Sequence, residues 1–378
     1  MRFALGWIPW SALALSSAAS ALDLTADSGA ANECAGAPHL QVAAAAYLQP
    51  APLSQLNEYG GSRYLPSAGN NIGVGVAFAE VSAAAAQFCI GLVYRAEFEG
   101  SASKDLLDIL HGNYFGQTFE PGRAYNARYD AQTLKAGGVR LRRALNLGEV
   151  KGFQISLGAG ISFLKAMQGR QENLSGTASA SSPSFAVGSA TWQRTDSDLN
   201  PADFNPFIGP GHPTGLGYST DLQLKAVSSS GTELDVIVMD AVGRIYWRGT
   251  RQSLLVLNND TILYDANFNR EALVTGVDSR INEVERIPAK YRVALSQPVV
   301  SQLSALLEDD AVNGYHFASL GVRLGSVHSY AATTFDLRTH AIGLRTHWHW
   351  VGIALASNRW QPREATALEA SVQASLEW

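Results

Sequence analysis

The residues best suited to bind a metal ion are two histidines near the C-terminus. His347 and His349 stand two positions apart in a His-Trp-His-Trp run, so on a strand both side chains would lie on one face. Imidazole is a common metal ligand, but no Cys, Asp or Glu stands nearby in the sequence to complete a set. Trp348 and Trp350 would lie on the opposite face, where a membrane barrel carries its aromatic girdle. We therefore expect a girdle at a strand end, with no metal site and no cofactor.

Catalytic motifs with a defined spacing are absent from the sequence. It holds no G-x-S-x-G nucleophile elbow, no H-E-x-x-H zinc motif and no Walker-type loop. We expect that the protein is not an enzyme. A membrane-embedded lipid hydrolase stays open as a third class of function, because Ser, His and Asp side chains on facing strands could meet without any local motif.

Charged side chains of both signs stand at alternating positions of the predicted strands and would share the inner face of a barrel. We take ten of them as candidates to contact a ligand in the lumen: Arg95, Glu97, Arg128, Arg140, Arg142, Asp221, Lys225, Arg292, Arg323 and Arg345. Asp130, Glu233, Asp235 and Lys290 would face the same way. A strongly ion-selective pore would carry a ring of one sign. The mixture fits either a polar path that receives a plug or, as we favour, salt bridges inside a small or gated lumen.

The elements that must position these residues are long amphipathic strands. Apolar and small or polar residues alternate with period two over 153–163, 216–226, 290–296 and 351–356. Many runs have about 9–11 residues, the length that a tilted strand needs to cross a bilayer. A soluble β-sandwich would show the same alternation, but its strands usually have about 5–6 residues. The pattern favours a closed transmembrane barrel over a sandwich.

The segment Gly73–Tyr94 resembles a transmembrane helix in composition, because its only charged residue is Glu80. Its period is nevertheless two. Val74, Val76 and Phe78 alternate with small residues, and the alternation resumes after a small-residue turn around 82–86. Glycines also disfavour a helix by about 1 kcal/mol each. The segment is therefore predicted to be a hairpin of two antiparallel strands with one apolar face.

The C-terminal residues also favour a transmembrane barrel over a soluble sandwich. Leu368, Val372 and Leu376 alternate with polar residues, and the sequence given ends on Trp378. This pattern resembles the terminal strand by which the insertion machinery of the bacterial outer membrane recognises its barrels. We expect this machinery and outer-membrane lipid as partners, and the bacterial outer membrane as the location.

Composition excludes several other classes. The chain has 378 residues, 28 Lys and Arg against 33 Asp and Glu, and a formal net charge of −5, which argues against a nucleic-acid partner. Its hydrophobic share of 46% excludes disorder. Two cysteines cannot build a disulfide scaffold or a four-thiolate zinc site. Cys34 and Cys89 could pair in an oxidising compartment, but the sequence does not decide whether they do.

Three regions follow from these patterns. Residues 1–21 have a positive start, a short apolar stretch and small residues at 19–21, which predicts a cleaved signal peptide. Residues 22–70 show little alternation and are predicted to form a plug-like segment. Residues 71–378 are predicted to form a closed antiparallel β-barrel of about 14 strands (12–16), allowing roughly 22 residues per strand and connection. We expect both termini on the periplasmic side, a short helix at 103–111, and loops at 175–184 and 195–215.

One segment carries a family resemblance. Ala43–Leu56 (AAAAYLQPAPLSQL) resembles the Ala-rich, Asn-Pro-Ala-containing segment of the long-chain fatty-acid transport barrels and of their secretion and conjugation accessory relatives. Gln49 replaces the motif's Asn, and Pro52 stands where a glycine is usual. The hairpin 215–247 is also similar to one in such proteins. The resemblance implies a 14-stranded barrel plugged by an N-terminal hatch, with Tyr47, Gln49, Pro50 and Leu53 as gate or plug residues.

Two main functions remain from the sequence. The first is passage of small, mostly hydrophobic molecules through a gated lumen, with a small hydrophobic ligand as a partner. The alternative is a structural or secretion-accessory barrel that does not conduct. The interleaved interior charges suggest the second, and the hatch-like segment suggests the first.

Overall fold

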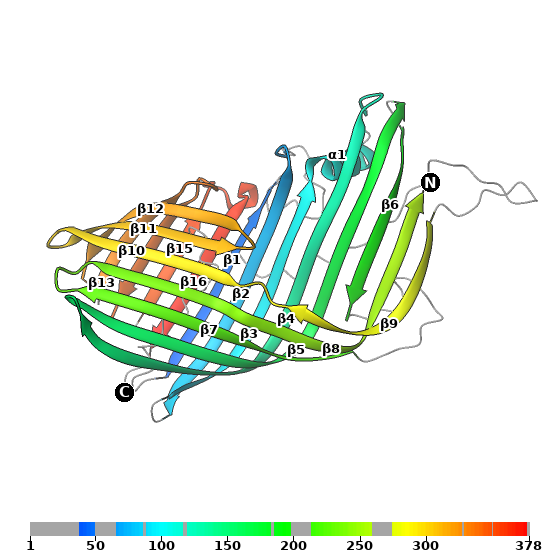
Figure 1. The fold of residues 1–378 in the computed structure, drawn as a ribbon. Helices are drawn as coiled ribbons and strands as arrows, with labels where there is room; N and C mark the ends of the chain where they lie inside the picture. The colour runs from blue at the N-terminus through cyan, green and yellow to red at the C-terminus, as the bar shows by residue number, and fades with distance from the viewer. Residues whose placement is uncertain are drawn as a thin grey trace, which may run out of the picture.

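A computed structural model describes residues 38–49, 66–85, 88–115, 119–182, 185–197, 213–258, 274–326, 329–349 and 351–375. These residues form one antiparallel sheet of sixteen strands and one α-helix (Figure 1). The strands are β1 (His39–Leu48), β2 (Asn70–Ala85), β3 (Phe88–Ser103), β4 (Ala124–Val150), β5 (Phe153–Ser182), β6 (Phe185–Asp196), β7 (Thr214–Ser228), β8 (Glu233–Asn258), β9 (Val274–Arg286), β10 (Lys290–Val300), β11 (Leu303–Val312), β12 (Tyr315–Gly325), β13 (Ser329–Asp336), β14 (Ile342–Trp348), β15 (Val351–Ser357) and β16 (Ala367–Ser375).

The sheet closes into a barrel with 14 strand positions. β1 pairs with β2 on one side and with β16 on the other. β6 and β7 follow one another along the same position between β5 and β8. β9 and β10 likewise share the position on the other side of β8. The described residues therefore confirm the predicted fold class, a closed all-β antiparallel barrel of about 14 strands.

The outer surface of the barrel is apolar. Leu92 on β3, Leu216 on β7 and Trp348 on β14 are 68%, 63% and 72% exposed, and their neighbours along each strand that point inward are mostly buried. In hydrocarbon every backbone polar group must be paired, which a closed barrel achieves and an open sheet does not. A closed barrel with an apolar exterior is the architecture of bacterial outer-membrane proteins. The protein is therefore an outer-membrane β-barrel.

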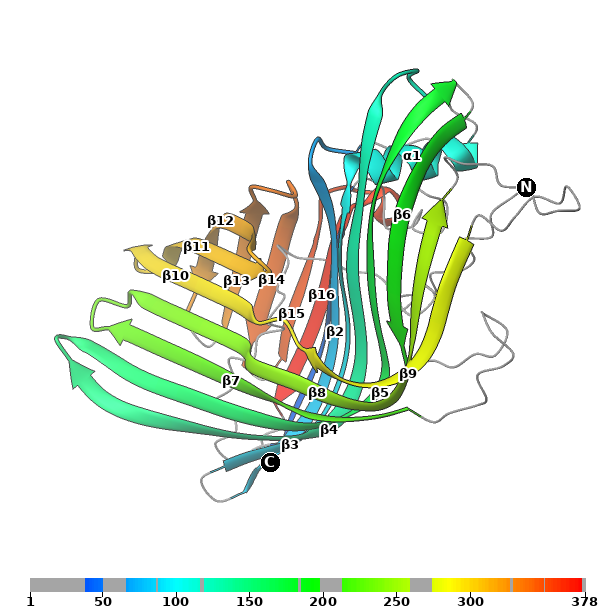
Figure 2. The same cartoon turned by 45° about the vertical axis from the view of Figure 1, so that its right-hand side comes forward.

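The two ends of the barrel differ in their connections. At one end the links β2–β3, β4–β5, β7–β8, β10–β11 and β14–β15 have two to four residues, and β1 begins and β16 ends there. Short turns are typical of the periplasmic end, and we call this the short-turn end. At the opposite, extracellular end, β4, β5, β6, β8 and β9 rise well beyond the short strands β10–β15 (Figure 2). β5 has 30 residues, whereas β14 has seven.

The helix α1 (Lys104–Phe115) lies beside the tall strands (Figure 1), where the sequence predicts one. The Ser103 hydroxyl accepts the N–H of Leu106 at 3.2 Å, as an N-cap does. Asp105 accepts the N–H of Asn126 at 2.9 Å and Arg123 at 2.7 Å. Burial alone would raise the pKa of Asp105, but these two donors hold it below its ordinary value. No helix among the described residues is long and apolar enough to cross a membrane.

The predicted plug is wrong for residues 39–48. They form β1, which is hydrogen-bonded along its length to β2 and β16 and is part of the barrel wall. Alanine is a weak strand former, but pairing on both sides outweighs that preference. Tyr47 is a wall residue whose side chain is buried, and the Gln49 N–H bonds the Ile72 carbonyl at 2.9 Å. Pro50 and Leu53 lie outside the described residues, as does most of the segment 22–70.

A second correction concerns the Ser/Ala-rich loop. Residues 175–182 belong to β5 and pair with β4 and β6. Small residues carry little polarity contrast, so the alternation cannot be seen in the sequence, whereas the two neighbouring strands supply the hydrogen bonds. The predicted loop 195–215 begins and ends in strands β6 and β7, and its residues 198–212 lie outside the described part.

A third correction concerns the hairpin of β2 and β3. The two strands pair as predicted, but their apolar side chains do not share one face. Val74, Val76 and Phe78 of β2 are buried in the interior, whereas Ile90 and Leu92 of β3 point outward. The interior therefore contains an apolar region that a water-filled barrel would lack.

The cysteine pair can be tested directly. Cys89 lies buried on β3 near the short-turn end and takes part in a disulfide. The chain's other cysteine is Cys34, which lies outside the described residues. We expect mass spectrometry of a digest of the purified protein to find a peptide containing both cysteines without reductant and none after reduction. Finding both thiols alkylated before reduction would contradict this expectation.

Candidate functional site

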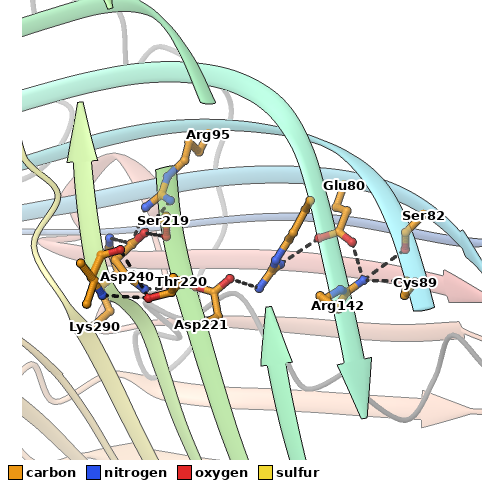
Figure 3. A network of polar contacts seen from close by, with 12 residues as sticks. Glu80, Ser82, Cys89, Arg95, Arg142, Ser219, Thr220, Asp221, Asp240 and Lys290 are labelled. Carbon is orange, nitrogen blue, oxygen red and sulfur yellow. Dashed lines mark hydrogen bonds and ion pairs between the residues drawn. The ribbon is translucent and has the colours of Figure 1, made fainter. Parts of the chain in front are cut away.

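The barrel interior contains a buried cluster of charges that connects opposite walls (Figure 3). Arg95 of β3 donates to Asp240 of β8, with Nη1 2.7 Å from Oδ1. Lys290 of β10 lies 2.9 Å from Asp240 and 2.8 Å from Glu97. Ser219 also donates to Asp240. Because β4, β5 and β7 lie between β3 and β8 in the wall, the contacts that Arg95 and Glu97 of β3 make with Asp240 and Lys290 run across the lumen. We call these five residues the Asp240 cluster.

A second cluster adjoins the first. Arg140 of β4 lies 2.9 Å from Glu80 of β2 and 2.7 Å from Asp221 of β7. Arg142 also binds Glu80. Asp221 accepts the backbone N–H of Asp240 at 3.1 Å, so the two clusters form one continuous network. We call Glu80, Arg140, Arg142 and Asp221 the Glu80 cluster.

The network balances its charges internally. Four cations, Arg95, Arg140, Arg142 and Lys290, face four carboxylates, Glu80, Glu97, Asp221 and Asp240, and all eight side chains are 10% exposed or less. Charges removed from water are tolerated when each is paired. The interior therefore offers no net charge at this level with which to select an ion, and the residues instead fasten one wall to another.

A backbone irregularity positions Asp240. On β7 the residues Thr220 and Leu222 pair with Val242 and Val238, so three residues of β8 stand opposite Asp221 alone. Asp240 has a φ of +57°, a conformation that Asp adopts more readily than most residues. This bulge turns Asp240 inward, and the ladder between β8 and β10 ends at Met239, beside it. Bulges commonly redirect a functional side chain in this way.

The remaining predicted lumen residues fall into two smaller groups. Glu308 of β11 lies 3.4 Å from Arg292 and 2.7 Å from Arg345 of β14. Glu233 binds Lys225 at 2.5 Å and Arg323 of β12 at 3.5 Å. Arg128 is the exception, because it lies exposed on β4 above the end of β3. Nine of the ten candidates thus take part in interior ion pairs.

Apolar side chains fill the interior beside these charges. Tyr47 of β1 and Phe317 of β12 meet edge to face with ring centroids 5.6 Å apart, although β13 to β16 separate their strands in the wall. Val74 and Val76 of β2 join the same cluster with Val312 of β11. Side chains of distant strands therefore meet in the lumen, and the apolar contact crosses the barrel as the ion pairs do.

A second apolar cluster surrounds Trp247 of β8. Its Nε1 donates to Glu285, and its ring lies against Gly215 of β7 and Gly169 of β5. A Cβ at Gly215 would lie 2.7 Å from the ring, and one at Gly169 would lie 2.5 Å from it. Glycine at both positions makes room for the indole. Phe78, Leu134 and Ile245 pack against the same cluster, together with several alanines.

Sequence reasoning missed several of these residues. The sequence pattern does not place Asp240 in the interior, because the bulge inserts extra residues into β8 and interrupts the alternation. No pattern of residue types indicates where such a bulge occurs. Glu80 could have been found, since it is the only charged residue of an apolar hairpin and such a residue needs a partner. Trp247 and Phe317 look like any other strand aromatics, and only barrel closure shows that they face inward.

The histidines of the predicted girdle have other neighbours. Trp348 is exposed on the outer face at the short-turn end, where a girdle residue belongs. His347 faces inward and stacks on Tyr330 at 5.6 Å between ring centroids. Trp350 lies outside the described residues. Within the described ranges no group of three or more His, Cys, Asp or Glu side chains is arranged to hold a metal ion.

Comparison with known proteins adds only distant structural similarity. No family model and no curated protein matches the chain. The translocator domain of the autotransporter NalP from Neisseria meningitidis is 10% identical over 90% of this chain and 86% of its own, with a TM-score of 0.26. The outer-membrane protease OmpT from Escherichia coli is 12% identical over 90% and 94%, with a TM-score of 0.22. At such scores the likeness says nothing about function, which must come from this chain's own geometry.

Proposed function

We propose that this outer-membrane barrel passes small, predominantly apolar molecules through a lumen that is closed at rest. The observation that carries the proposal is the apolar interior. Tyr47, Val76 and Phe317 belong to one buried cluster and Phe78, Ile245 and Trp247 to another, whereas water-filled barrels have a polar interior. Such surfaces favour an apolar solute over an ion or a sugar, because desolvating the polar solute is costly.

The proposed gate consists of side chains of the wall itself. Tyr47 and Phe317 meet across the lumen, and the Asp240 cluster bridges β3, β8 and β10. Between these contacts lies a cavity of about 20 Å³, lined by Val76, Glu97, Gln132 and Lys290 among others, which is room for about one water molecule. Passage would require the aromatic pair to separate.

The alternative is a barrel that serves a structural or secretion-accessory role and never conducts. The balanced network of eight charges favours it, because cross-wall ion pairs stiffen a barrel without leaving a path. The two proposals differ in one respect that can be measured. A gated path should open when the aromatic contact is removed, whereas a barrel filled throughout should stay closed.

Removing both rings of the aromatic pair is the test. We expect Tyr47→Ala with Phe317→Ala to increase the uptake of the apolar dye N-phenylnaphthylamine by expressing cells about tenfold over the unmodified chain. The reason is that the double variant removes both rings of the aromatic contact that crosses the lumen. Tyr94→Ala is the matched control, because Tyr94 is an aromatic residue of β3 that points outward. It should leave uptake unchanged.

Two outcomes would count against the proposal. If the double variant folds, as shown by its heat-dependent mobility in gels, and admits no more dye than the unmodified chain, the non-conducting alternative is favoured. If it admits a hydrophilic sugar as readily as the dye in a vesicle-swelling assay, the path exists but is not selective for apolar molecules.

A further inference from the structure

We propose that the outer face of β5, β8 and β9, at the extracellular border of the membrane, binds the phosphate groups of an outer-leaflet lipid. The site consists of Lys165, Arg244, Arg248 and Arg286, which we call the rim cation patch. All four side chains are exposed on the face that continues the lipid-contacting surface. The proposal rests on the barrel fold and does not depend on whether the lumen conducts.

The pairing of two arginines is the first observation. Arg244 of β8 stands directly opposite Arg286 of β9 in the antiparallel ladder. Like charges directly opposite one another destabilise a sheet. The same hydrogen-bonded row continues with Tyr218 and Phe163, and the next row contains Lys165, Leu216, Tyr246 and Val284. Neither row contains an acid, so the sheet itself provides no counter-charge to these cations.

The rim cation patch differs from the other charged groups described because they have partners of opposite charge. The interior cations are matched by carboxylates, as Arg95 is by Asp240. Farther along β8, Arg251 is paired with Asp278 at 2.8 Å, and both side chains are only 11% exposed. Among the described residues no carboxylate lies within ion-pair distance of Arg244, Arg286 or Lys165. An anion from outside the chain would supply the missing charge.

The depth of the patch identifies the source of that anion. A tilted strand crosses the hydrocarbon in about 9–11 residues. Arg244 stands 11 residues beyond Glu233, where β8 starts at the short-turn end, and Lys165 stands 12 beyond Phe153, where β5 starts. Val236, Val238 and Leu224 form the apolar surface below. Tyr218 and Tyr246 lie in the same rows as the cations, as interfacial tyrosines do. The patch therefore lies at the level of the lipid headgroups.

The spacing of the cations fits a lipid with more than one phosphate. Arg244 and Arg286 are on adjacent strands and can hold one phosphate together, since guanidinium groups bind phosphate in a bidentate manner. Lys165 lies two strands away from β8, about 10 Å, and would reach a second phosphate. Arg248, four residues beyond Arg244, extends the patch away from the hydrocarbon.

Titration of the purified barrel in detergent micelles with diphosphorylated lipid A tests the site. We expect the variant Lys165→Gln, Arg244→Gln, Arg286→Gln to bind about 100-fold more weakly, at about 1 kcal/mol for each cation near a lipid surface. The single variant Arg286→Gln should lose about fivefold. This single variant provides the test if the triple variant fails to fold. Arg143→Gln is the matched control, because Arg143 is also exposed on the outer face but lies at the short-turn end, over the Phe88 ring at 5.3 Å.

The outcomes separate the proposal from its rivals. Unchanged binding by Arg143→Gln together with the expected losses supports a lipid site. Binding by the triple variant within threefold of the unmodified chain overturns it. An equal loss in Arg143→Gln would mean that any outer cation attracts the lipid. Competition by inorganic phosphate at the same concentration as lipid A would mean a site for a free anion and not for a lipid.

Discussion

Replacing Asp240 with alanine is expected to lower the free energy of unfolding by about 3–5 kcal/mol, the cost of leaving buried cations without their partner. Asp240 accepts from Arg95 and Ser219 and lies 2.9 Å from Lys290. Its removal leaves two cations with one carboxylate, Glu97, in a region where neither cation is more than 3% exposed. Urea unfolding in lipid vesicles, followed by tryptophan fluorescence, measures the change.

Two further variants sharpen this prediction. Asp240→Asn keeps the size of the side chain and an oxygen for Ser219 but loses the charge, so most of the destabilisation should remain. Asp309→Ala removes an acid of β11 that is 39% exposed and paired with His316. Exposed pairs contribute about 0–1 kcal/mol, and this control should unfold close to the unmodified chain. An Asp240→Ala barrel within 1 kcal/mol of the unmodified one would mean that the network does not fasten the walls.

Proline at position 370 should prevent barrel closure altogether. Ala370 lies in the middle of β16 and pairs with Ala44 of β1 and with Leu355 of β15. Since β16 is paired on both sides, the amide of residue 370 has a partner that proline cannot bond. An unpaired backbone group in hydrocarbon costs several kcal/mol, and the seam between the first and last strands would open.

The measurement is the heat-dependent shift in gel mobility that a closed barrel shows. We expect Ala370→Pro to lack the compact, fast-migrating form and to be absent from washed outer membranes. Ala370→Val is the matched control, because it keeps the amide and suits a strand. A compact form of Ala370→Pro at unmodified levels would show that the seam contributes little to closure.

The sequence was sufficient for the fold class where side chains contrast in polarity. Runs such as 216–226 alternate clearly in the sequence and form β7. Alternation is not visible where the residues are small. Ala43–Ala46 and Ser175–Ser182 carry no contrast, so a wall strand was assigned to a plug and the end of β5 to a loop. Pairing with neighbours decides such segments, and neighbours cannot be read from one sequence.

The candidate site was predictable in its members and not in its connections. Alternation identified Arg95, Arg140 and Arg292 as inward residues, which the structure places in ion pairs. Arg95 and Asp240 are separated by 145 residues, and only closure of the barrel brings them together. The rim cation patch depends on register for the same reason, because Arg244 and Arg286 become neighbours only through the β8–β9 ladder.

The unequal height of the wall has a consequence at the cell surface. On the side of β4, β5, β6, β8 and β9 the sheet extends far beyond the strands of the opposite side, where the turn between β11 and β12 lies low (Figure 2). An antibody or a phage approaching through the sugar layer would meet the crest of β5 and β6 first. A labelling reagent too bulky to pass between the surface sugars should modify that crest and spare the low side.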